Sequence, residues 1–230
     1  MAGVARRIAT PTLLVVMLVG FALLVGCAVA LGELLELAER ADGSTAIDSS
    51  ITSWVVAHRT PALTTAARLF STLGSQAVLI PLTAIVTVAL LGRRRFVLAG
   101  LLLAVWGGAI GLYSLTKQFV HRMRPPAEIW LTDVGRTTSF PSGHATQSLA
   151  TFLALVVVGA VWLPNARWPA RAVAVALAIA VGWSRVYLGV HWATDVGAGW
   201  LIAAAWLTIV IWLARAAHSI LEPPRGEPAV

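Results

Sequence analysis

The chain has 230 residues, of which 58% are apolar and 12% charged, where a soluble domain carries about 25% charged residues. A soluble domain of this size cannot bury so much apolar surface, so the composition excludes a water-soluble fold and indicates a membrane protein. The net charge of +7 is divided among short clusters between apolar runs, a pattern that indicates orientation in a bilayer rather than nucleic-acid binding.

Six apolar segments are long enough, or nearly long enough, to cross a bilayer as helices, which takes about 20 residues. These segments are residues 11–31, 74–91, 96–116, 146–163, 172–187 and 196–214. The predicted fold class is therefore all-α, a polytopic membrane bundle of six transmembrane helices that forms a single domain over residues 1–221. The end of the chain, residues 222–230, is rich in proline and is expected to be a disordered tail.

The first apolar segment allows two interpretations. Arg6 and Arg7 before an apolar run are also typical of a signal peptide, and residues 24–27 resemble a bacterial lipoprotein cleavage site. The apolar run continues through Leu31, however, where a lipoprotein usually becomes polar. We therefore expect an uncleaved first helix, with cleavage at Cys27 as the alternative. Cys27 is the only cysteine, so the chain has no internal disulfide.

Residues 44–72 are expected to form two short helices on the membrane surface. Ile51, Trp54 and Val55 fall on one helical face, and Pro61 interrupts the pattern before a second apolar stretch at 63–70. An amphipathic cap over the bundle and a gate for a substrate are both open interpretations of this segment.

The distribution of charge predicts the orientation of the bundle. If the N-terminus lies inside and the connections alternate, the inner connections carry the whole net charge and the outer ones carry none. The positive-inside rule then places both termini in the cytoplasm, with residues 93–95, three arginines in a tight connection, as the strongest anchor. Connections 32–73 and 117–145 are predicted to lie on the outer face of the plasma membrane.

The first cluster of polar residues, from Lys117 to Pro125, ends the third predicted span. Lys117 is the only lysine in the chain, and Arg124 follows seven residues later. Both side chains can reach one anion if the chain turns between them. Ordinary snorkelling of cations at a span end is the structural alternative, and it is the simpler interpretation of this cluster taken alone.

The second cluster, residues 139–144, directly precedes the fourth predicted span. Ser142 is a natural N-cap, and Gly143 allows the backbone to approach a ligand closely. Free N–H groups at a helix N-terminus suit phosphate, and His144 would lie beside it. A capped helix start with an incidental histidine is the alternative.

The third cluster runs from Ser184 to Asp195. His191 and Asp195 are four residues apart, which places them on one face of a helix. The carboxylate can hold one ring nitrogen as N–H and leave the other as a lone pair, as an activated histidine nucleophile or general base requires. Arg185 precedes His191 by six residues, with Gly189 between them to permit a turn. A structural ion pair at a helix end is the alternative.

Together the three clusters predict one phosphoryl-transfer site on the outer face. One histidine can attack phosphorus while the other protonates the leaving oxygen. The cations and backbone N–H groups would stabilise the equatorial oxygens. The acidic residues do not form the cluster that a metal site needs, so we predict neither a metal nor any other cofactor.

The three clusters resemble the pattern of the type 2 phosphatidic acid phosphatase superfamily, K-x6-RP, PSGH and SR-x5-H-x3-D, in both spacing and order. The motifs span residues 117–195, and the first 116 residues resemble the family only in layout. The resemblance implies that His191 forms a phosphohistidine, that Asp195 orients it, and that His144 is the general acid and later the base. It also implies a phosphate-binding set: Lys117, Arg124, Ser142, Gly143 and Arg185.

The resemblance therefore implies a lipid phosphatase, with undecaprenyl diphosphate, phosphatidylglycerol phosphate and phosphatidic acid as candidate substrates. Related soluble haloperoxidases hold vanadate in the same cradle, but they lack a six-span bundle. Transfer of the phosphoryl group to a lipid or sugar acceptor is an alternative, as is binding or transport of an anionic lipid without cleavage. The expected partners are a membrane lipid and the bilayer, not a nucleic acid. No residue in the sequence selects the lipid or indicates an oligomeric state.

Overall fold

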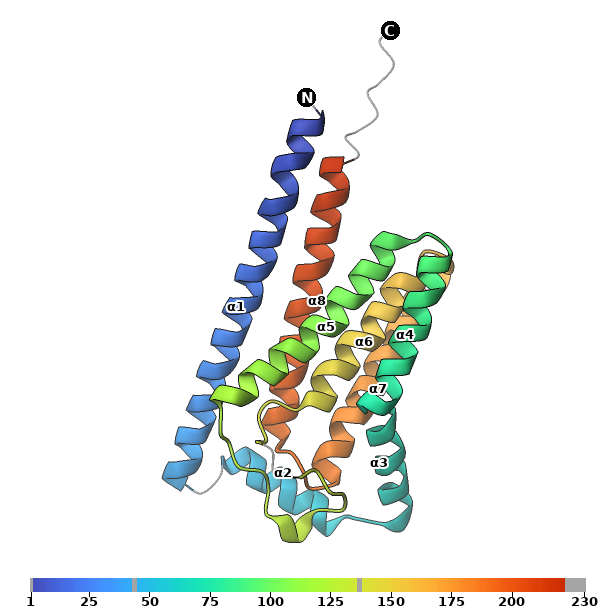
Figure 1. Ribbon diagram of the computed structural model, residues 1–230. Coiled ribbons are helices and arrows are strands. Elements are labelled where there is room, and N and C mark those ends of the chain that lie inside the picture. Colours follow the sequence, from blue (N-terminus) through green and yellow to red (C-terminus); the bar gives the residue numbers. More distant parts are fainter. Residues whose placement is uncertain (1, 43–44, 136–137, 222–230) are drawn as a thin grey trace.

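The computed structural model describes residues 2–42, 45–135 and 138–221 (Figure 1). All the regular secondary structure of the described chain is helical, which confirms the predicted all-α class. The elements are α1 (Ala2–Asp42), α2 (Ala46–Ala57), α3 (Pro61–Leu73), α4 (Gln76–Gly92), α5 (Phe96–Phe119), η1 (Ala127–Ile129), α6 (Gly143–Gly159), η2 (Pro164–Ala166), α7 (Arg167–Tyr187) and α8 (Ala193–Leu221). The predicted tail, residues 222–230, lies outside the described residues.

Each predicted apolar segment corresponds to one long helix: α1, α4, α5, α6, α7 or α8. Four stretches of the described chain are long and apolar enough to cross a membrane, namely Pro11–Glu39, Phe96–Phe119, Pro164–Tyr187 and Ala193–Ala217. A fifth is added if α3 and α4, which meet at a bend of 43°, count as one span. Length and composition therefore establish four or five candidate spans. The prediction of six depends on the 17-residue α6 crossing as well.

The two helices predicted between residues 44 and 72 are present as α2 and α3. Thr45 and Thr60 cap them by accepting the backbone N–H groups of Asp48 and Leu63, and Pro61 occupies the first turn of α3. Figure 1 shows α2 running across the end of the bundle, whereas α3 leads into α4. The helix that follows Pro61 is therefore the first half of a bent pair and does not lie across the bundle end as α2 does.

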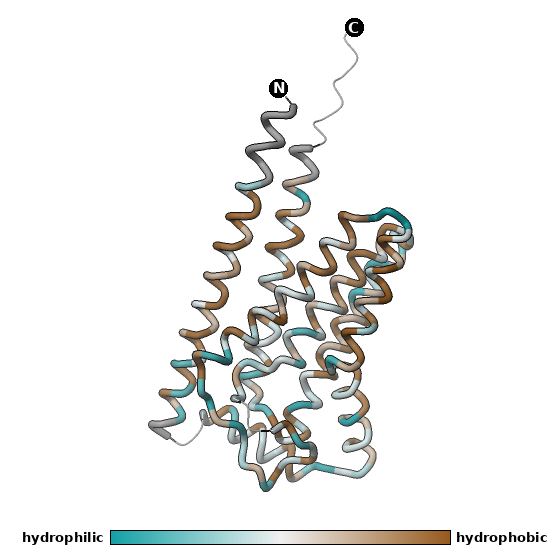
Figure 2. Tube along the Cα trace, in the orientation of Figure 1, coloured by the Kyte–Doolittle hydropathy of each residue, from teal (hydrophilic) through white to brown (hydrophobic). Residues whose placement is uncertain are grey.

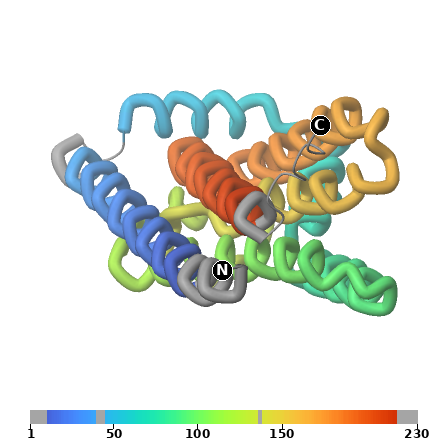
Figure 3. Tube along the Cα trace, turned by 90° about the horizontal axis from the view of Figure 1, so that it is seen from above, coloured from blue at the N-terminus to red at the C-terminus, as the bar shows by residue number. Residues whose placement is uncertain are grey.

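The helices pack around a small-residue core. α6 contacts α5, α7 and α8, while α1 packs against α8 and α5, as Figure 3 shows from above. Close approach depends on small side chains: a Cβ added to Gly108 would lie 2.2 Å from the indole nitrogen of Trp206. Such contacts are typical of helix association in lipid, where small residues let backbones come together.

Apolar side chains cover the outside of the bundle. Leu18, Ile85, Val88 and Val97 are all more than half exposed, and Figure 2 shows apolar residues along much of α1, α4 and α5. A surface of this kind is stable only in a lipid solvent.

Most of the buried polar side chains, in contrast, gather at one end of the bundle. The beginning of α1, the end of α8 and the α4–α5 turn lie at the opposite end (Figure 1). The fold therefore collects its buried polar groups beside α2, α3 and the connection between α5 and α6.

Candidate active site

The predicted site residues come together at the polar end of the bundle. Six of the eight line one cavity of about 580 Å³: Lys117, Arg124, Gly143, His144, Arg185 and His191. Ser142 and Asp195 lie directly behind it, where the backbone N–H of Ser142 donates to the carbonyl of Asp195 at 3.1 Å. The junction of α3 and α4 closes the cavity with Ser71, Thr72, Ser75 and Gln76.

A tight turn after α7 places His191. Gly189 has φ +75°, in the left-handed region that favours glycine, and a Cβ there would lie 2.6 Å from the carbonyl oxygen of Ile129. The N–H of Leu131 donates to the carbonyl of Leu188 at 2.9 Å, which holds the turn against the α5–α6 connection. The predicted turn at Gly189 is therefore present, and no other residue type fits it without displacement.

His191 and Asp195 form the predicted pair. Nδ1 of His191 lies 3.4 Å from Oδ2 of Asp195, and both side chains are buried. The same carboxylate oxygen accepts the Ser139 hydroxyl at 2.5 Å and the backbone N–H of Trp192 at 2.9 Å. Asp195 is thus held by three groups on the side that faces the imidazole.

The other ring nitrogen of His191 contacts a cation. Nη1 of Arg124 lies 3.2 Å from Nε2 of His191. A guanidinium has no acceptor, so Nε2 must carry a lone pair and the ring proton must lie on Nδ1, facing Asp195. Burial, opposed by the Asp195 hydrogen bond and aided by the Arg124 charge, lowers the pKa of His191 to about 3. The imidazole is therefore neutral, as a nucleophile requires.

The three cations around the cavity are held by neutral oxygens. Lys117 donates to the carbonyls of Thr138 at 2.5 Å and Ser139 at 3.2 Å. Arg185 donates to the Ser71 hydroxyl, and Arg124 donates to the carbonyl of Thr138 at 3.3 Å. Among the described residues no carboxylate forms an ion pair with Lys117 or Arg185. Their charges therefore remain available for an anion.

Three polar atoms beside the cavity have no hydrogen-bond partner within the described chain. They are Nε of Arg185 and Oγ of Ser142, which are donors, and Oε1 of Gln147, which is an acceptor; all three are buried. Ser142 occupies the N-cap position of α6, as predicted, but its hydroxyl makes no capping bond. Buried polar atoms are rarely left without a partner, and phosphate oxygens would satisfy both donors.

Two residues of the site were not assigned a role from the sequence. Ser139 bonds to Asp195 and lies 3.4 Å from Nδ1 of His191. Arg122, which is fully buried, bonds to the other oxygen of Asp195 at 2.6 Å. Arg122 lies within the first polar cluster, residues 117–125, and among the charges of the outer connections, but it was given no role because its partners are far away in the sequence.

No metal-ligand cluster accompanies these residues. Within the described part of the chain, no three His, Cys, Asp or Glu side chains converge as metal ligands would. The charged groups around the cavity are three cations and the carboxylate of Asp133, with two histidines beside them, so positive charge is in excess and suits an anion.

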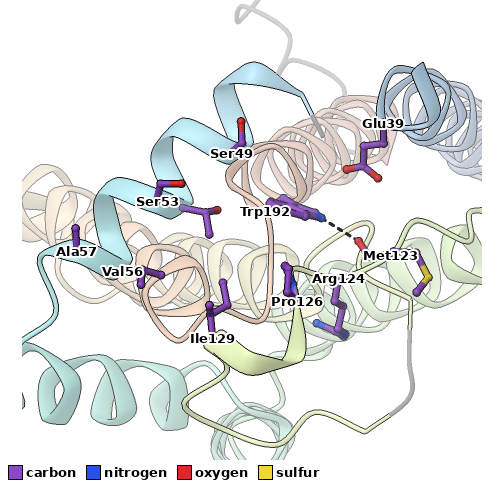
Figure 4. A pocket seen from close by; sticks show the side chains of 11 residues that line it. Glu39, Ser49, Ser53, Val56, Ala57, Met123, Arg124, Pro126, Ile129 and Trp192 are labelled. Carbon is purple, nitrogen blue, oxygen red and sulfur yellow. Dashed lines mark hydrogen bonds between the residues drawn. The ribbon is translucent and has the colours of Figure 1, made fainter. Parts of the chain in front are cut away.

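A second cavity, of about 660 Å³, lies on the other side of Arg124 (Figure 4). α2 forms one wall with Ser49, Ser53, Val56 and Ala57, and Pro126 and Ile129 form another. Trp192 also lines this cavity, and it donates its indole N–H to the carbonyl of Met123 at 2.9 Å. Arg124 lines both cavities and so forms the boundary between them.

A family model described as the PAP2 superfamily matches residues 95–219. Phosphatidylglycerophosphatase B of Bacillus subtilis is 30% identical over 155 residues, which cover 66% of this chain and 75% of that protein. The Escherichia coli protein of the same name is 36% identical over 98 residues, 43% of this chain and 37% of that one. An undecaprenyl-diphosphatase of Sulfolobus acidocaldarius is 31% identical over 141 residues, 60% of this chain and 63% of that protein.

Two solved structures share the fold. The crystal structure of a transmembrane PAP2-type phosphatidylglycerolphosphate phosphatase from Bacillus subtilis aligns with a TM-score of 0.71 and 25% identity, covering 87% of this chain and 98% of that one. The crystal structure of Aquifex aeolicus LpxE aligns with a TM-score of 0.60 and 24% identity, covering 73% and 96%, and shows likeness of fold alone. With the candidate spans, these similarities establish a multi-pass membrane protein.

Proposed function

The chain belongs to the PAP2 superfamily, and on this premise we propose that it is a metal-independent lipid phosphate phosphatase in which His191 is the nucleophile. One observation carries the proposal. The cavity that contains His191 and His144 is lined by three cations, and the buried donors on Arg185 and Ser142 have no partner within the described chain. An anion with several oxygens fits this arrangement better than any other ligand.

The first half of the reaction transfers the phosphoryl group to the enzyme. The Nε2 lone pair of His191 attacks the terminal phosphorus, and the bond from phosphorus to the leaving oxygen breaks. That oxygen is the alcohol oxygen of a lipid monophosphate or the bridging oxygen of a lipid diphosphate. His144, on the same cavity wall as Gly143, gives its proton to that oxygen, so that a lipid alcohol or lipid monophosphate leaves. Asp195 faces the Nδ1 proton and stabilises the positive charge that develops on the ring.

The second half releases phosphate. His144 takes a proton from a water molecule, whose oxygen attacks phosphorus and breaks the bond to Nε2. His191 returns to its neutral form, and inorganic phosphate leaves. Lys117, Arg124 and Arg185 stabilise the equatorial oxygens in both halves, with Ser142 and the backbone of Gly143 at the start of α6 completing the cradle.

The substrate is proposed to be a lipid mono- or diphosphate. Two relatives are named for phosphatidylglycerophosphate and one for undecaprenyl diphosphate. These two lipids and phosphatidic acid are therefore the candidates, and all three present a terminal phosphate on an apolar anchor.

We further propose six spans, with α3 and α4 together as one of them and α6 as the shortest, and a cytoplasmic location for both termini. Arg93 to Arg95 and Arg167 lie at the end of the bundle that is opposite the cavity (Figure 1), as the positive-inside rule expects of a cytoplasmic end. Residues 1–221 then form one membrane domain of the plasma membrane, residues 222–230 a cytoplasmic tail, and the cavity opens at the extracytoplasmic face. A reporter that is active only in the cytoplasm should be active when it is fused after Val230, and a reporter that is active only outside the cell should not.

A phosphate-release assay over the three candidate lipids tests the function. Wild-type protein in detergent should release phosphate from at least one of them, and His191→Ala should release less than about a thousandth as much. Absence of release from every lipid, with binding retained, would favour an anionic-lipid binder or transporter. Loss of the lipid phosphate without free phosphate would favour transfer to another acceptor.

A further inference from the structure

Arg122 lies at the centre of a buried polar cluster beside the proposed nucleophile. Its side chain is fully buried, and all three nitrogens of its guanidinium donate hydrogen bonds. The partners are Glu39, Asp48, Thr194 and Asp195, which together with Arg122 we call the Arg122 cluster.

The guanidinium divides its donors between two directions. Nη1 donates to Oδ1 of Asp195 at 2.6 Å and to the Thr194 hydroxyl at 2.7 Å. On the opposite side, Nε and Nη2 donate to Oε1 of Glu39 at 2.8 and 2.5 Å, and Nη2 also donates to Oδ2 of Asp48 at 2.8 Å. Arg122 therefore joins the catalytic end of α8 to the end of α1 and to α2.

Asp195 is consequently fixed through both of its oxygens. Arg122 holds Oδ1, while Oδ2 faces Nδ1 of His191 at 3.4 Å. Rotation of the carboxylate would have to break the buried contact with Arg122 as well as the hydrogen bonds from Ser139 and Trp192, so Arg122 helps to fix which oxygen faces the imidazole. Burial lowers the pKa of Arg122, but Asp195, Glu39 and Asp48 raise it by more, so the guanidinium keeps its charge.

Glu39 and Asp48 hold Arg122 from outside the region that matches the family model, residues 95–219. Asp48 also accepts the backbone N–H and the hydroxyl of Thr194, at 3.0 and 2.6 Å. In Figure 4 Glu39 extends from α1 toward Trp192 and the segment that contains Met123. α1 and α2 thus hold Arg122 in place, and Arg122 in turn holds Asp195.

We propose that Arg122 is a positioning residue for the reaction: it orients Asp195 toward His191, and Glu39 and Asp48 anchor it from α1 and α2. The inference rests on the proposed function, because it concerns the orientation of the proposed nucleophile. Arg122 does not line the cavity that holds the phosphate, so its effect should be on the chemical step and not on binding.

The test is a double-mutant cycle on phosphate release. Arg122→Lys keeps the charge but cannot reach all four partners at once, and it should lower kcat by about 10- to 100-fold with KM within about twofold of wild type. In an Asp195→Asn background the same substitution should change kcat by no more than about twofold, because groups that act through one another are not additive. A residue with only a structural role would give additive losses.

Arg59→Lys is the matched control. Arg59 also ties the N-terminal helices to the bundle, through hydrogen bonds to the carbonyl of Tyr187 at 2.8 and 3.2 Å, but it contacts no member of the Arg122 cluster. Arg59→Lys should leave kcat within about twofold of wild type even where it lowers the melting temperature. Melting temperatures of all variants are measured in the same detergent, so that kcat refers to folded protein.

If Arg122→Lys does not fold, the double-mutant cycle can be repeated with Asp48→Asn, which removes one of the two carboxylates that anchor Arg122. It should lower kcat less than Arg122→Lys does and should again have no added effect beside Asp195→Asn. An unchanged kcat for folded Arg122→Lys, or additive losses in either cycle, would overturn the inference while leaving the proposed function intact. A wild-type protein that releases no phosphate from any of the lipids would instead overturn the proposed function.

Discussion

Nη1 of Arg124 lies 3.2 Å from Nε2 of His191, the ring nitrogen that faces away from Asp195. Because a guanidinium only donates, the contact keeps the proton on Nδ1 and covers the lone pair on Nε2. A phosphate that enters the cavity offers Arg124 stronger, charged acceptors and so draws it away from the ring. In the proposed mechanism, Arg124 would thus both bind the substrate and uncover the nucleophile.

Arg124→Lys should therefore impair both binding and chemistry. Lysine keeps a charge but lacks the planar fork that can contact two phosphate oxygens at once, so we expect KM to rise about tenfold and kcat to fall about 10- to 100-fold. Steady-state phosphate release measures both. Arg68→Lys is the control, because Arg68 is exposed and only contacts the carbonyl of Leu131 at 3.4 Å. Equal losses in the two variants would contradict the role of Arg124.

The acid limb of the pH profile should lie well below pH 6.5. Burial and the Arg124 charge lower the pKa of His191 to about 3, so His191 keeps its Nε2 lone pair as the pH falls from 8 to 5. Arg124→Gln removes a charge that lowers this pKa and should move the acid limb to higher pH. The measurement is kcat/KM against pH, with the buffer held at constant ionic strength. An acid limb that stays in place in Arg124→Gln would argue against the close contact between the two residues.

The free energy of unfolding should fall as the pH drops from about 6.5 toward 3, before the activity is lost. The unfolded chain gives His191 its ordinary pKa of about 6.5, above the folded value of about 3. As the pH drops below 6.5, the unfolded state binds the proton first, so the free energy of unfolding decreases. His191→Asn should reduce this pH dependence. Melting temperatures of both proteins at pH 7 and pH 5 provide the comparison.

Gly189→Ala should destabilise the protein and reduce its activity. A Cβ at φ +75° would be strained and would lie 2.6 Å from the carbonyl of Ile129. A left-handed backbone alone costs an L-residue about 1–2 kcal/mol, and the displaced turn would carry His191 with it. Gly197→Ala is the control, because nothing lies within 4 Å of a Cβ added there. We expect a lower melting temperature and lower kcat for Gly189→Ala alone; similar values for both variants would show that the turn tolerates a side chain.

Chelation should leave the activity unchanged. The proposed chemistry uses cationic side chains and two histidines around the phosphate, so EDTA removes nothing that the reaction needs. Vanadate, which mimics a five-coordinate phosphorus, should compete with the lipid. Inactivation by EDTA that added Mg²⁺ reverses would reject the metal-independent mechanism.

The helices of the bundle could be predicted from the sequence because a long apolar run is a local signal. The ends of these helices could not be predicted. α1 continues to Asp42, beyond the predicted end at residue 31, because residues 33–41 are all Glu, Leu, Ala or Arg, which favour a helix although the segment is no longer apolar. The break between α3 and α4 is marked by Gly74 and Ser75, which occupy the C-cap of α3 and the N-cap position of α4, but these residues do not indicate the bend of 43°.

The spacing of the three motifs predicted that their residues would come together, and one cavity does collect residues from all three. The role of Arg122 could not be predicted, because its partners Glu39 and Asp48 are 83 and 74 residues away in the sequence. From the sequence alone, an arginine near the end of a span that reaches water cannot be distinguished from one, such as Arg122, that is buried among three carboxylates. Only the packing of α1, α2 and α8 distinguishes the two.

The bundle carries its polar cavity at one end and exposes apolar side chains along its flanks. A lipid whose tails stay in the bilayer would therefore meet the cavity by moving sideways within the membrane plane. For such a substrate the meaningful concentration is the fraction of the surface that it occupies, not the amount per volume of solution. Turnover would then slow when inert lipid or detergent dilutes the surface, even though the total quantity of substrate in the sample stays the same.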